Sequence, residues 1–347
     1  MSYTPLKPRI ALVDPMCREG YSPASLTAGG LGGTEATVLR IARALGDDFA
    51  FTHYQKGRDR VQDSPAGVLR PLCQIERLDA EAIIVINAWK VAVKLRKAHP
   101  DLPIFLWLHV HPGRHNRRMG AALHRAGIAV ICVSRSHVAE LRDFLSPGPL
   151  PDILHVYNPI ADGLAPDDTP RRRNRLLYAS SPHKGLAEVF ARFDRLRRAL
   201  PELTLALADP GYLRWDAGPV PQNVVSLGTL SHAALIRQMR QSLCLFYPQT
   251  GFAETFGLVL AEANAVGTPV LAHAGLGAND EVVSTAGQLL DANDPEAILS
   301  RIRAWQAAPP RIVGKPCFRL SQLREDWAGI LRTALGVEPE FRQVRVG

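Results

Sequence analysis

The sequence lacks any long apolar segment. None of its apolar runs approaches the roughly 18 consecutive residues that a membrane-spanning helix needs. The opening MSYTPLKPRIALVDP lacks the apolar stretch and cleavage site of a secretory signal. A hydrophobic fraction of 46% and a charged fraction of 21% are typical of a folded, water-soluble protein. We therefore expect a cytoplasmic protein, and its 347 residues suffice for about two domains.

Cysteine is scarce and scattered. The five cysteines are odd in number, widely separated and nowhere arranged as C-x-x-C: Cys17, Cys73, Cys132, Cys244 and Cys317. This spacing disfavours both a disulfide framework and a structural zinc site.

Acidic and aromatic residues are both under-represented. The chain has 41 Lys and Arg against 33 Asp and Glu, a net charge of +8, and its arginines concentrate at 114–118, 171–175 and 192–198. Basic patches suit nucleic acid, anionic lipid or phosphorylated substrates. Because aromatic content is only 7% and no helix-turn-helix or RNA-binding motif is recognisable, we expect no nucleic-acid partner. We interpret RRRNR at 171–175 as the solvated end of a linker.

Short apolar strands alternate with amphipathic helices along the whole chain. This pattern predicts an α/β fold with parallel sheets. Expected strands begin at Arg9 and recur to Tyr157, then resume at Leu176 and recur to His273. We interpret the Pro- and Asp-rich segment 161–175, between the two series of strands, as an interdomain linker. We therefore predict domains at 1–162 and 163–319, with a helix in 320–347 packing back onto the first domain.

The segment GFAETFGLVLAEANAVGTPVL, residues 251–271, carries two carboxylates eight positions apart. A helix that opens at the Phe256-Gly257-Leu258 turn would present unpaired amides at the positive end of its dipole, which attracts phosphate. Glu254 and Glu262 can accept hydrogen bonds from hydroxyls on either side. A nucleotide sugar fits this arrangement. The alternative is that Glu254 is an exposed residue at the helix start and Glu262 lies on a solvated helix face.

This segment resembles the E-x7-E motif of the retaining, nucleotide-sugar-dependent glycosyltransferases of family four. The resemblance continues through Gly267–Val270 and a glycine-rich loop with Gly275 and Gly277 to the acid Glu281. It implies the GT-B fold, two Rossmann-like domains facing a central cleft. It also implies metal-independent, retaining transfer of a sugar from UDP or GDP to a hydroxyl acceptor. No cofactor is expected beyond the donor substrate, and no D-x-D metal motif is present.

The turn LLYASSPHKGLAEVF resembles the family's G-R-x-x-x-x-K-G loop. Lys184 is expected to meet the donor diphosphate and stabilise charge on the leaving group. The loop's usual arginine is missing and Ser180 and Ser181 stand in its neighbourhood, so we expect Ser181 to donate a hydrogen bond, with His183 or a distant arginine supplying charge. In the roles that the resemblance implies, Glu254 orients the sugar and Glu262 holds the ribose.

Two further turns resemble donor-binding loops of the family. AGGLGGTEATVLRIARAL lacks a P-loop's Lys-Ser/Thr and any G-x-G-x-x-G. It resembles the family's GG-x-E loop, which lies beside the donor's phosphates and the acceptor and points to Gly32 and Gly33. The alternative there is a flexible loop with Thr34 as a helix cap. LGTLSHAAL resembles the turn whose backbone contacts the nucleobase, which makes Gly228 and Thr229 candidates.

Histidines gather after the fourth expected strand, in LWLHVHPGRHNR. The H-x-H spacing of His109 and His111 is compatible with a metal, yet no carboxylate or cysteine lies close enough in sequence to complete a site, so we predict none. The resemblance places His109 near the donor sugar, with His111 as its nearest rival and His115 on the surface.

The acceptor is the least defined part of the prediction. A glycan or lipid-linked sugar in cell-envelope polysaccharide or glycolipid synthesis is expected by analogy. A lipid-linked acceptor would bring the protein into peripheral contact with the inner face of the membrane, which is the second interpretation of the basic patches. The rival hypothesis is a catalytically idle GT-B protein that binds nucleotide sugar or a partner subunit.

Overall fold

The protein folds into two α/β units. A computed structural model describes residues 6–211 and 215–337. Among these residues, contacts group 6–24, 34–159 and 320–337 into a first unit, and 25–33 with 160–211 and 215–319 into a second. The predicted boundary after residue 162 thus differs by three residues, and one short early segment joins the second unit. Residues 338–347 of the predicted C-terminal segment lie outside the described part.

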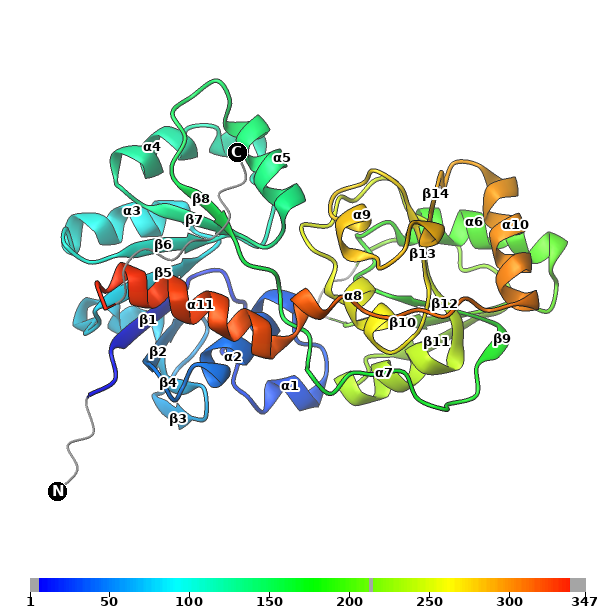
Figure 1. Cartoon of the computed structure of the whole chain (residues 1–347), viewed down its shortest axis with the longest axis horizontal. Helices are drawn as coiled ribbons and strands as arrows, with labels where there is room; N and C mark the ends of the chain where they lie inside the picture. The colour runs from blue at the N-terminus through cyan, green and yellow to red at the C-terminus, as the bar shows by residue number, and fades with distance from the viewer. Residues whose placement is uncertain (1–5, 212–214, 338–347) are drawn as a thin grey trace. The chain divides into compact units, whose positions relative to one another are not determined.

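The first unit is built on an eight-stranded sheet (Figure 1). Its order is β3-β4-β2-β1-β5-β6-β7-β8, and only the β3–β4 pair is antiparallel. Strand order therefore reverses direction between β1 and β5, the point at which ligands bind in open parallel sheets. The strands are β1 Arg9–Asp14, β2 Ala50–Gln55, β3 Gln62–Ser64, β4 Gly67–Pro71, β5 Ala82–Ile86, β6 Ile104–Trp107, β7 Ala129–Cys132 and β8 Ile153–His155.

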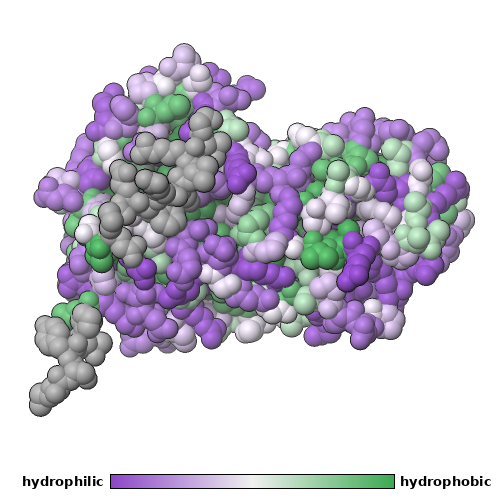
Figure 2. Space-filling view, in the orientation of Figure 1, coloured by the Kyte–Doolittle hydropathy of each residue, from purple (hydrophilic) through white to green (hydrophobic). Residues whose placement is uncertain are grey.

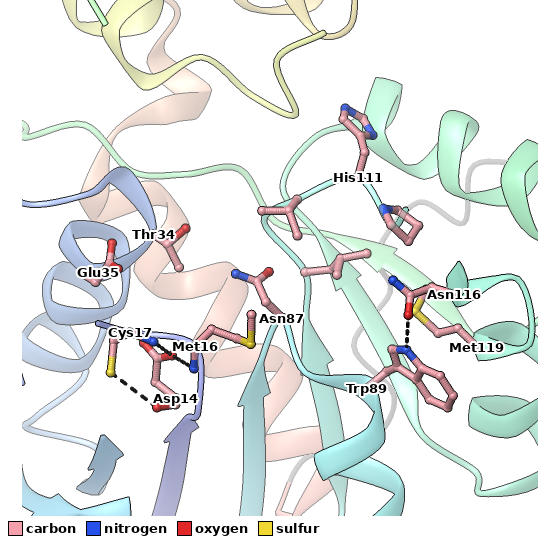
Figure 3. Close-up of a pocket in the computed structure, with 13 residues that line it drawn as sticks. Asp14, Met16, Cys17, Thr34, Glu35, Asn87, Trp89, His111, Asn116 and Met119 are labelled. Atoms are coloured by element: carbon pink, nitrogen blue, oxygen red, sulfur yellow. Dashed lines mark hydrogen bonds between the residues drawn. The ribbon is translucent and has the colours of Figure 1, made fainter. Parts of the chain in front are cut away.

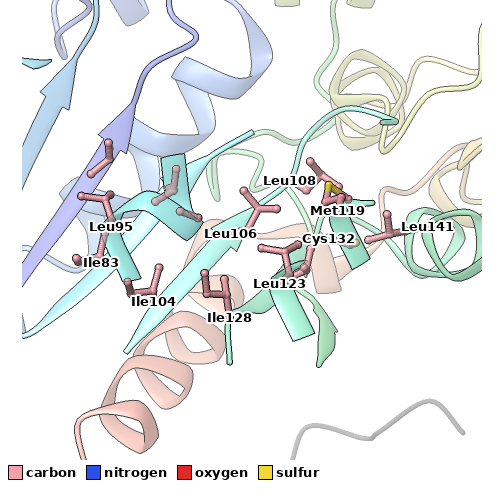
Figure 4. Close-up of a cluster of buried hydrophobic side chains, with 14 of the residues drawn as sticks. Ile83, Leu95, Ile104, Leu106, Leu108, Met119, Leu123, Ile128, Cys132 and Leu141 are labelled. Carbon is pink, nitrogen blue, oxygen red and sulfur yellow. The ribbon is translucent and has the colours of Figure 1, made fainter. Parts of the chain in front are cut away.

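The sheet is apolar on both faces because helices cover both. On one face the helices α3 (Trp89–Ala98), α4 (Met119–Arg125) and α5 (Arg135–Leu145) supply a buried cluster with alternate strand residues. Ile104 and Leu106 of β6 belong to that cluster (Figure 4). Because both faces of these strands are buried, nearly every residue along them is apolar.

The other face receives the C-terminal helix. Trp107 of β6 lies 4.4 Å, centroid to centroid, from Trp327 of α11 (Leu320–Ala334). Arg324 of α11 donates to the carbonyl of Ala44, the last residue of α2 (Gly33–Ala44), at 3.0 Å and also pairs with Asp48. The chain thus returns to the first unit after completing the second.

The second unit holds a six-stranded, wholly parallel sheet. Its order is β11-β10-β9-β12-β13-β14, so the reversal falls between β9 and β12. The strands are β9 Arg172–Ala179, β10 Thr204–Ala208, β11 Val224–Gly228, β12 Ser242–Tyr247, β13 Val270–His273 and β14 Leu289–Leu290. Its helices are α1 Ser25–Ala28, α6 Leu186–Ala199, α7 His232–Gln241, α8 Leu258–Ala265, α9 Asn279–Val282 and α10 Pro295–Ala307.

The segment RRRNR is solvated as predicted, because Arg172, Arg173 and Asn174 are exposed, but it is not the end of a linker. Strand β9 begins at Arg172, so most of this run is part of the sheet. Arg171 donates to the carbonyl of Gly267 at 2.7 Å, and Arg173 donates to that of Gln306 at 2.9 Å. The guanidinium groups instead satisfy carbonyls where neighbouring helices end.

The surface gives no sign of a membrane-spanning element. No helix within residues 6–211 and 215–337 is long and apolar enough to cross a bilayer. The face drawn in Figure 2 is mostly hydrophilic, with apolar residues scattered among polar ones. Scattered apolar residues of this kind are normal on protein surfaces.

The packing of α11 gives a stability prediction. Trp327→Ala removes a fully buried indole from its contact with Trp107, so we expect the free energy of unfolding to fall by about 3–5 kcal/mol. Trp215→Ala makes the same truncation at a side chain that is 59% exposed and should cost about 1 kcal/mol or less. Denaturant unfolding followed by circular dichroism measures both, and equal losses would contradict the docking of α11 through Trp327.

Candidate functional site

Two charged side chains meet at the point where strand order reverses in the second unit. Lys184 follows β9, and Glu254 follows β12. The Lys184 ammonium lies 2.9 Å from both carboxylate oxygens of Glu254. Glu254 is only 6% exposed, so the ammonium offsets the cost of burying the carboxylate. The alternative of an exposed Glu254 is therefore wrong.

A buried phenol completes the surroundings of Glu254. Tyr247, the last residue of β12, donates from its hydroxyl to Glu254 Oε1 at 2.9 Å. Burial, followed by the charge of Glu254, raises the pKa of Tyr247 well above its ordinary value, so the phenol keeps its proton and remains a donor. Lys184 also lies over the ring of Phe252, 4.9 Å from its centroid.

The loop between β12 and Glu254 is fixed by two polar side chains. Glu188 of α6 accepts the Thr250 amide at 2.9 Å and the Thr250 hydroxyl at 2.8 Å. Gln249 accepts the Phe252 amide at 2.7 Å and donates to the Phe252 carbonyl at 2.8 Å. Because these bonds set the path of the loop, they set the position of Glu254.

Glycines let the backbone close tightly around Glu254. A Cβ on Gly277, whose φ is +52°, would lie 2.5 Å from the Glu254 carbonyl oxygen. Gly185, with φ of +84°, leads into α6, and a Cβ there would lie 2.5 Å from Cβ of Gln249. Left-handed backbone with no room for a side chain explains why this site requires glycine.

Helix α8 begins beside Glu254. Its N-cap is Gly257, in the left-handed region with φ of 86°, and its first residue is Leu258. The Phe256 side chain is buried against Phe318, with ring centroids 5.1 Å apart. Phe256 therefore offers a ligand only its backbone, as the prediction for the turn at Phe256, Gly257 and Leu258 requires.

The second carboxylate of the motif is also buried. Glu262 is 5% exposed, so the alternative of a solvated helix face is wrong. Its Oε1 lies 2.8 Å from Nε2 of His232, the first residue of α7. Sequence reasoning did not single out His232, because the two residues stand 30 positions apart.

Ser181 lies in the same turn as Lys184 but faces a different partner. Its hydroxyl lies 3.0 Å from Nδ1 of His183. Desolvation, and then Lys184, lower the pKa of His183, which favours its neutral form. His183 is thus poorly suited to supply the charge of the missing arginine.

The other predicted donor-binding residues end strands or precede a helix. Gly228 is the last residue of β11, and Thr229 follows it. A Cβ on Gly211, in the loop after β10, would lie 2.5 Å from the Thr229 hydroxyl oxygen. This packing brings the ends of β10 and β11 together.

The early glycine loop packs against the same turns of the second unit. Gly29, with φ of +92°, approaches the backbone of Leu230, where a Cβ would lie 2.7 Å from the carbonyl oxygen. A Cβ on Gly33 would lie 3.1 Å from Cδ1 of Leu258. Gly32 is half-buried just before α2. Positive φ angles, which favour glycine, occur at Gly29 and Gly30 and not at Gly32 or Gly33.

The first unit has a pocket of its own, with a volume of about 310 Å³ (Figure 3). It lies at the other reversal of strand order, because Asp14 ends β1 and Asn87 follows β5. His111 contributes to its lining, whereas His109 does not. The role of His109 at the donor sugar stays a prediction.

His109 is buried in the first unit. It is 6% exposed, and its ring packs against Trp107 at 4.8 Å between centroids. Desolvation, and then nearby His137, lower the pKa of His109 to about 3. The imidazole is therefore neutral near pH 7. His115 is exposed on the surface.

No group of three or more potential metal ligands occurs within the described residues. Metal independence stays a prediction.

Comparison with known proteins identifies the second unit. Residues 173–312, which include Lys184, Glu254 and Glu262, match the family described as glycosyl transferases group 1. A segment of 112 residues is 31% identical to a phosphatidyl-myo-inositol mannosyltransferase of Mycobacterium tuberculosis, over 30% of this chain and 29% of that protein.

A second curated relative is a glycogen synthase of Mycobacterium tuberculosis. It is 29% identical over 194 residues, which are 49% of this chain and 46% of the synthase. The matched stretch is thus less than a third of the length of the mannosyltransferase and less than half of the synthase.

Solved structures resemble the whole chain. Anabaena HepE, solved with UDP and glucose, superposes with a TM-score of 0.65 at 16% identity and covers 94% of this chain and 100% of its own. A Burkholderia xenovorans α,α-trehalose-phosphate synthase gives a TM-score of 0.64 at 12% identity, over 94% and 97%. These likenesses confirm the GT-B fold that the sequence motif implied.

The close approach of the backbone at Gly277 predicts that adding a single methyl group there destabilises the protein. Gly277→Ala forces a side chain into left-handed backbone and against the Glu254 carbonyl, so we expect it to cost about 1–3 kcal/mol of stability. Gly287→Ala is the matched control, because a Cβ there meets nothing within 4 Å. Thermal unfolding of both variants decides the point, and a wild-type-like Gly277→Ala would contradict the close approach.

The buried His109 predicts a pH dependence of stability. The unfolded chain takes up a proton below about pH 6.5, whereas folded His109 remains neutral down to about pH 3. Unfolding free energy should therefore fall as pH falls below 6.5, by up to about 1.4 kcal/mol per pH unit for this residue. Denaturant titrations at pH 7, 6 and 5 should give a shallower decline for His109→Asn. An unchanged decline would show that His109 is protonated in the fold.

Proposed function

We propose that the protein is a retaining glycosyltransferase that moves a sugar from a nucleoside-diphosphate sugar to a hydroxyl acceptor. The observation that carries the proposal is the buried Lys184–Glu254 pair, at the strand reversal of a segment that matches the glycosyl transferases group 1. UDP or GDP is the proposed nucleotide. The UDP and glucose bound to the similar HepE support a nucleotide-sugar donor.

The diphosphate would lie between Lys184 and the start of α8. The ammonium has three N–H donors, two of which meet Glu254, so the third is available to a phosphate oxygen. The amides of the turn at Phe256, Gly257 and Leu258 point from the positive end of the helix dipole. Both groups would stabilise the negative charge that grows on the departing diphosphate.

The two carboxylates would hold the polyol ends of the donor. Glu254, fixed by Tyr247 and Lys184, would accept hydrogen bonds from the transferred sugar. Glu262 would accept them from the ribose, in competition with His232. Gly228 and Thr229 would line the nucleobase.

Transfer with retention requires the acceptor oxygen to attack from the face that the diphosphate leaves. The bond between the anomeric carbon and the phosphate oxygen breaks as the bond from that carbon to the acceptor oxygen forms. The acceptor proton passes to the released phosphate oxygen. The step balances without a protein base, a cofactor or a metal, and we propose it in that form.

The acceptor is proposed to be a glycan or a lipid-linked sugar. The similarity to a phosphatidyl-myo-inositol mannosyltransferase and to a glycogen synthase supports these two acceptor classes. Arg114, Arg117 and Arg118 are exposed and would favour peripheral contact with an anionic membrane surface.

Nucleotide release by the purified chain from UDP-, GDP- and ADP-sugars tests the proposal. We expect release from one nucleotide class and a loss of at least about a hundredfold in Glu254→Gln and Lys184→Met. Because Lys184→Met leaves Glu254 buried without its cation, the double variant Lys184→Met/Glu254→Gln, which removes both charges, separates misfolding from lost chemistry. Lys97→Met, at an exposed helix position in the first unit, is the control for loss of a positive charge.

The outcomes separate the enzyme from its rival. Donor binding by calorimetry without release or transfer, for every sugar and acceptor supplied, would promote the idle nucleotide-sugar-binding protein. Absence of both binding and release would refute the donor site itself. Wild-type release by the folded double variant would refute the roles given to Lys184 and Glu254.

A further inference from the structure

His183 stands immediately before Lys184, in the turn from β9 to α6, and the proposed function gives it no role. Its ring centroid lies 5.5 Å from that of Phe252, at an interplanar angle of 85°. On another side the ring meets Trp215, with centroids 6.1 Å apart and an angle of 62°. Lys184 lies over the same Phe252 ring, 4.9 Å from its centroid. His183 and Lys184 are therefore members of one cluster around Phe252.

The hydroxyl of Ser181 determines which nitrogen of His183 carries a proton. Ser181 is 1% exposed, and its Oγ lies 3.0 Å from Nδ1 of His183. Within the described residues, Nδ1 is the only hydrogen-bond partner of this hydroxyl. If Nδ1 carried a proton, the buried hydroxyl would have no acceptor for its own, which is unfavourable. Ser181 therefore donates and Nδ1 accepts.

This hydrogen bond selects the neutral imidazole with its proton on Nε2. A neutral imidazole that accepts at Nδ1 is a donor at Nε2, whereas an imidazolium is a donor at both nitrogens. The electrostatic surroundings act in the same direction. Desolvation and then the charge of Lys184 lower the pKa of His183, and the charge of Glu254 opposes them only in part. Hydrogen-bond accounting and electrostatics thus agree on a neutral His183.

The Nε2–H group of His183 is available to a ligand. Among residues 6–211 and 215–337, no protein group accepts a hydrogen bond from it. The side chain is only half-buried, and its contacts with Ser181, Phe252 and Trp215 hold the ring in one orientation. A donor that is already held in place loses little conformational entropy when a ligand binds. The structure thus presents a fixed neutral N–H beside the ammonium of Lys184.

We propose that Nε2–H of His183 donates a hydrogen bond to the diphosphate of the donor substrate, as a neutral partner of the Lys184 ammonium. The inference rests on the proposed function and adds a substrate-binding residue to its donor site. Ser181 is a positioning residue, because it acts on the substrate only by keeping the proton on Nε2. His183 then supplies a hydrogen bond, but not the charge that the family's loop arginine would bring. Charged acceptors such as phosphate make strong hydrogen bonds with such donors.

The proposed contact predicts which part of the ligand responds to a change at His183. His183→Leu removes the N–H donor, so we expect affinity for the nucleoside diphosphate to fall at least about tenfold. The corresponding nucleoside has no phosphate, and its affinity should stay within about threefold of the wild-type value. His183→Gln keeps an N–H donor at a similar reach and should bind the diphosphate within about threefold of wild type.

Calorimetry on the purified chain measures these affinities. The ligands are UDP, GDP and ADP, and displacement of the bound diphosphate by its nucleoside gives the nucleoside affinity. Ser181→Ala should weaken diphosphate binding about two- to fivefold in the wild-type background and not at all in His183→Leu, because its effect passes through the imidazole. His115→Leu removes an exposed histidine of the first unit and is the matched control.

A second pair of variants guards against misfolding of His183→Leu. The amide nitrogen of asparagine reaches only as far as Nδ1 of histidine, whereas that of glutamine reaches about as far as Nε2. We therefore expect His183→Asn to lose at least about tenfold in diphosphate affinity and His183→Gln to keep it. Thermal unfolding of each variant establishes that it is folded.

The pH dependence of binding tests the charge of the imidazole. If His183 bound the diphosphate as a cation, wild-type affinity would fall between pH 6 and pH 8 as the ring lost its proton. That fall would be missing from His183→Gln. We expect the two proteins to show the same pH dependence, because the neutral ring has no proton to lose and titration of the nucleotide affects both equally.

The outcomes separate this inference from the proposed function. Wild-type diphosphate affinity in folded His183→Leu or His183→Asn would overturn it. Equal losses for nucleoside and diphosphate would show that His183 supports the fold and not the phosphate, and a pH-dependent fall confined to wild type would show a cation. In each of these cases the wild-type chain binds the nucleotide, so the proposed function stands. A wild-type chain that binds no nucleoside diphosphate refutes the donor site itself.

Discussion

The burial of a negative charge at the end of β12 organises the second unit. Glu254 is almost inaccessible to water, and an uncompensated carboxylate there would cost several kcal/mol. Lys184 supplies the charge and Tyr247 a further donor, both at 2.9 Å. The glycines at 185 and 277 follow from the same constraint, because backbone has to approach closely wherever the loops close around this carboxylate.

The two units use one topological rule for different chemistry. Each sheet reverses its strand order once, and each reversal gathers polar side chains at the carboxyl ends of two strands. In the second unit those side chains are a cation and a carboxylate beside a helix start, which suits a diphosphate flanked by hydroxyls. In the first they are the carboxylate of Asp14 and the amide of Asn87. The two units therefore share a type of fold but present different functional groups at their strand reversals.

Much of the fold could be predicted because buried parallel strands are apolar along their whole length. Strand β1 begins at Arg9 and strand β13 ends at His273, as predicted. The antiparallel hairpin of β3 and β4 was not predicted, since Gln62–Ser64 is polar and short. The strand start at Arg172 was missed because its arginines resemble a linker, and only the carbonyls that they reach give them a structural role.

The sequence alone determined the local chemistry. It placed two glutamates around a glycine turn that opens a helix, set a lysine at a strand-to-helix turn, and resembled a family that residues 173–312 match. Tertiary structure alone decided which groups meet. Lys184 and Glu254 are 70 positions apart, and Glu262 meets a histidine that no motif marked. Asp14 and Asn87 share a pocket only because β1 and β5 are neighbours. Sequence patterns report the environment of one segment at a time, whereas these encounters depend on strand order, which non-local packing sets.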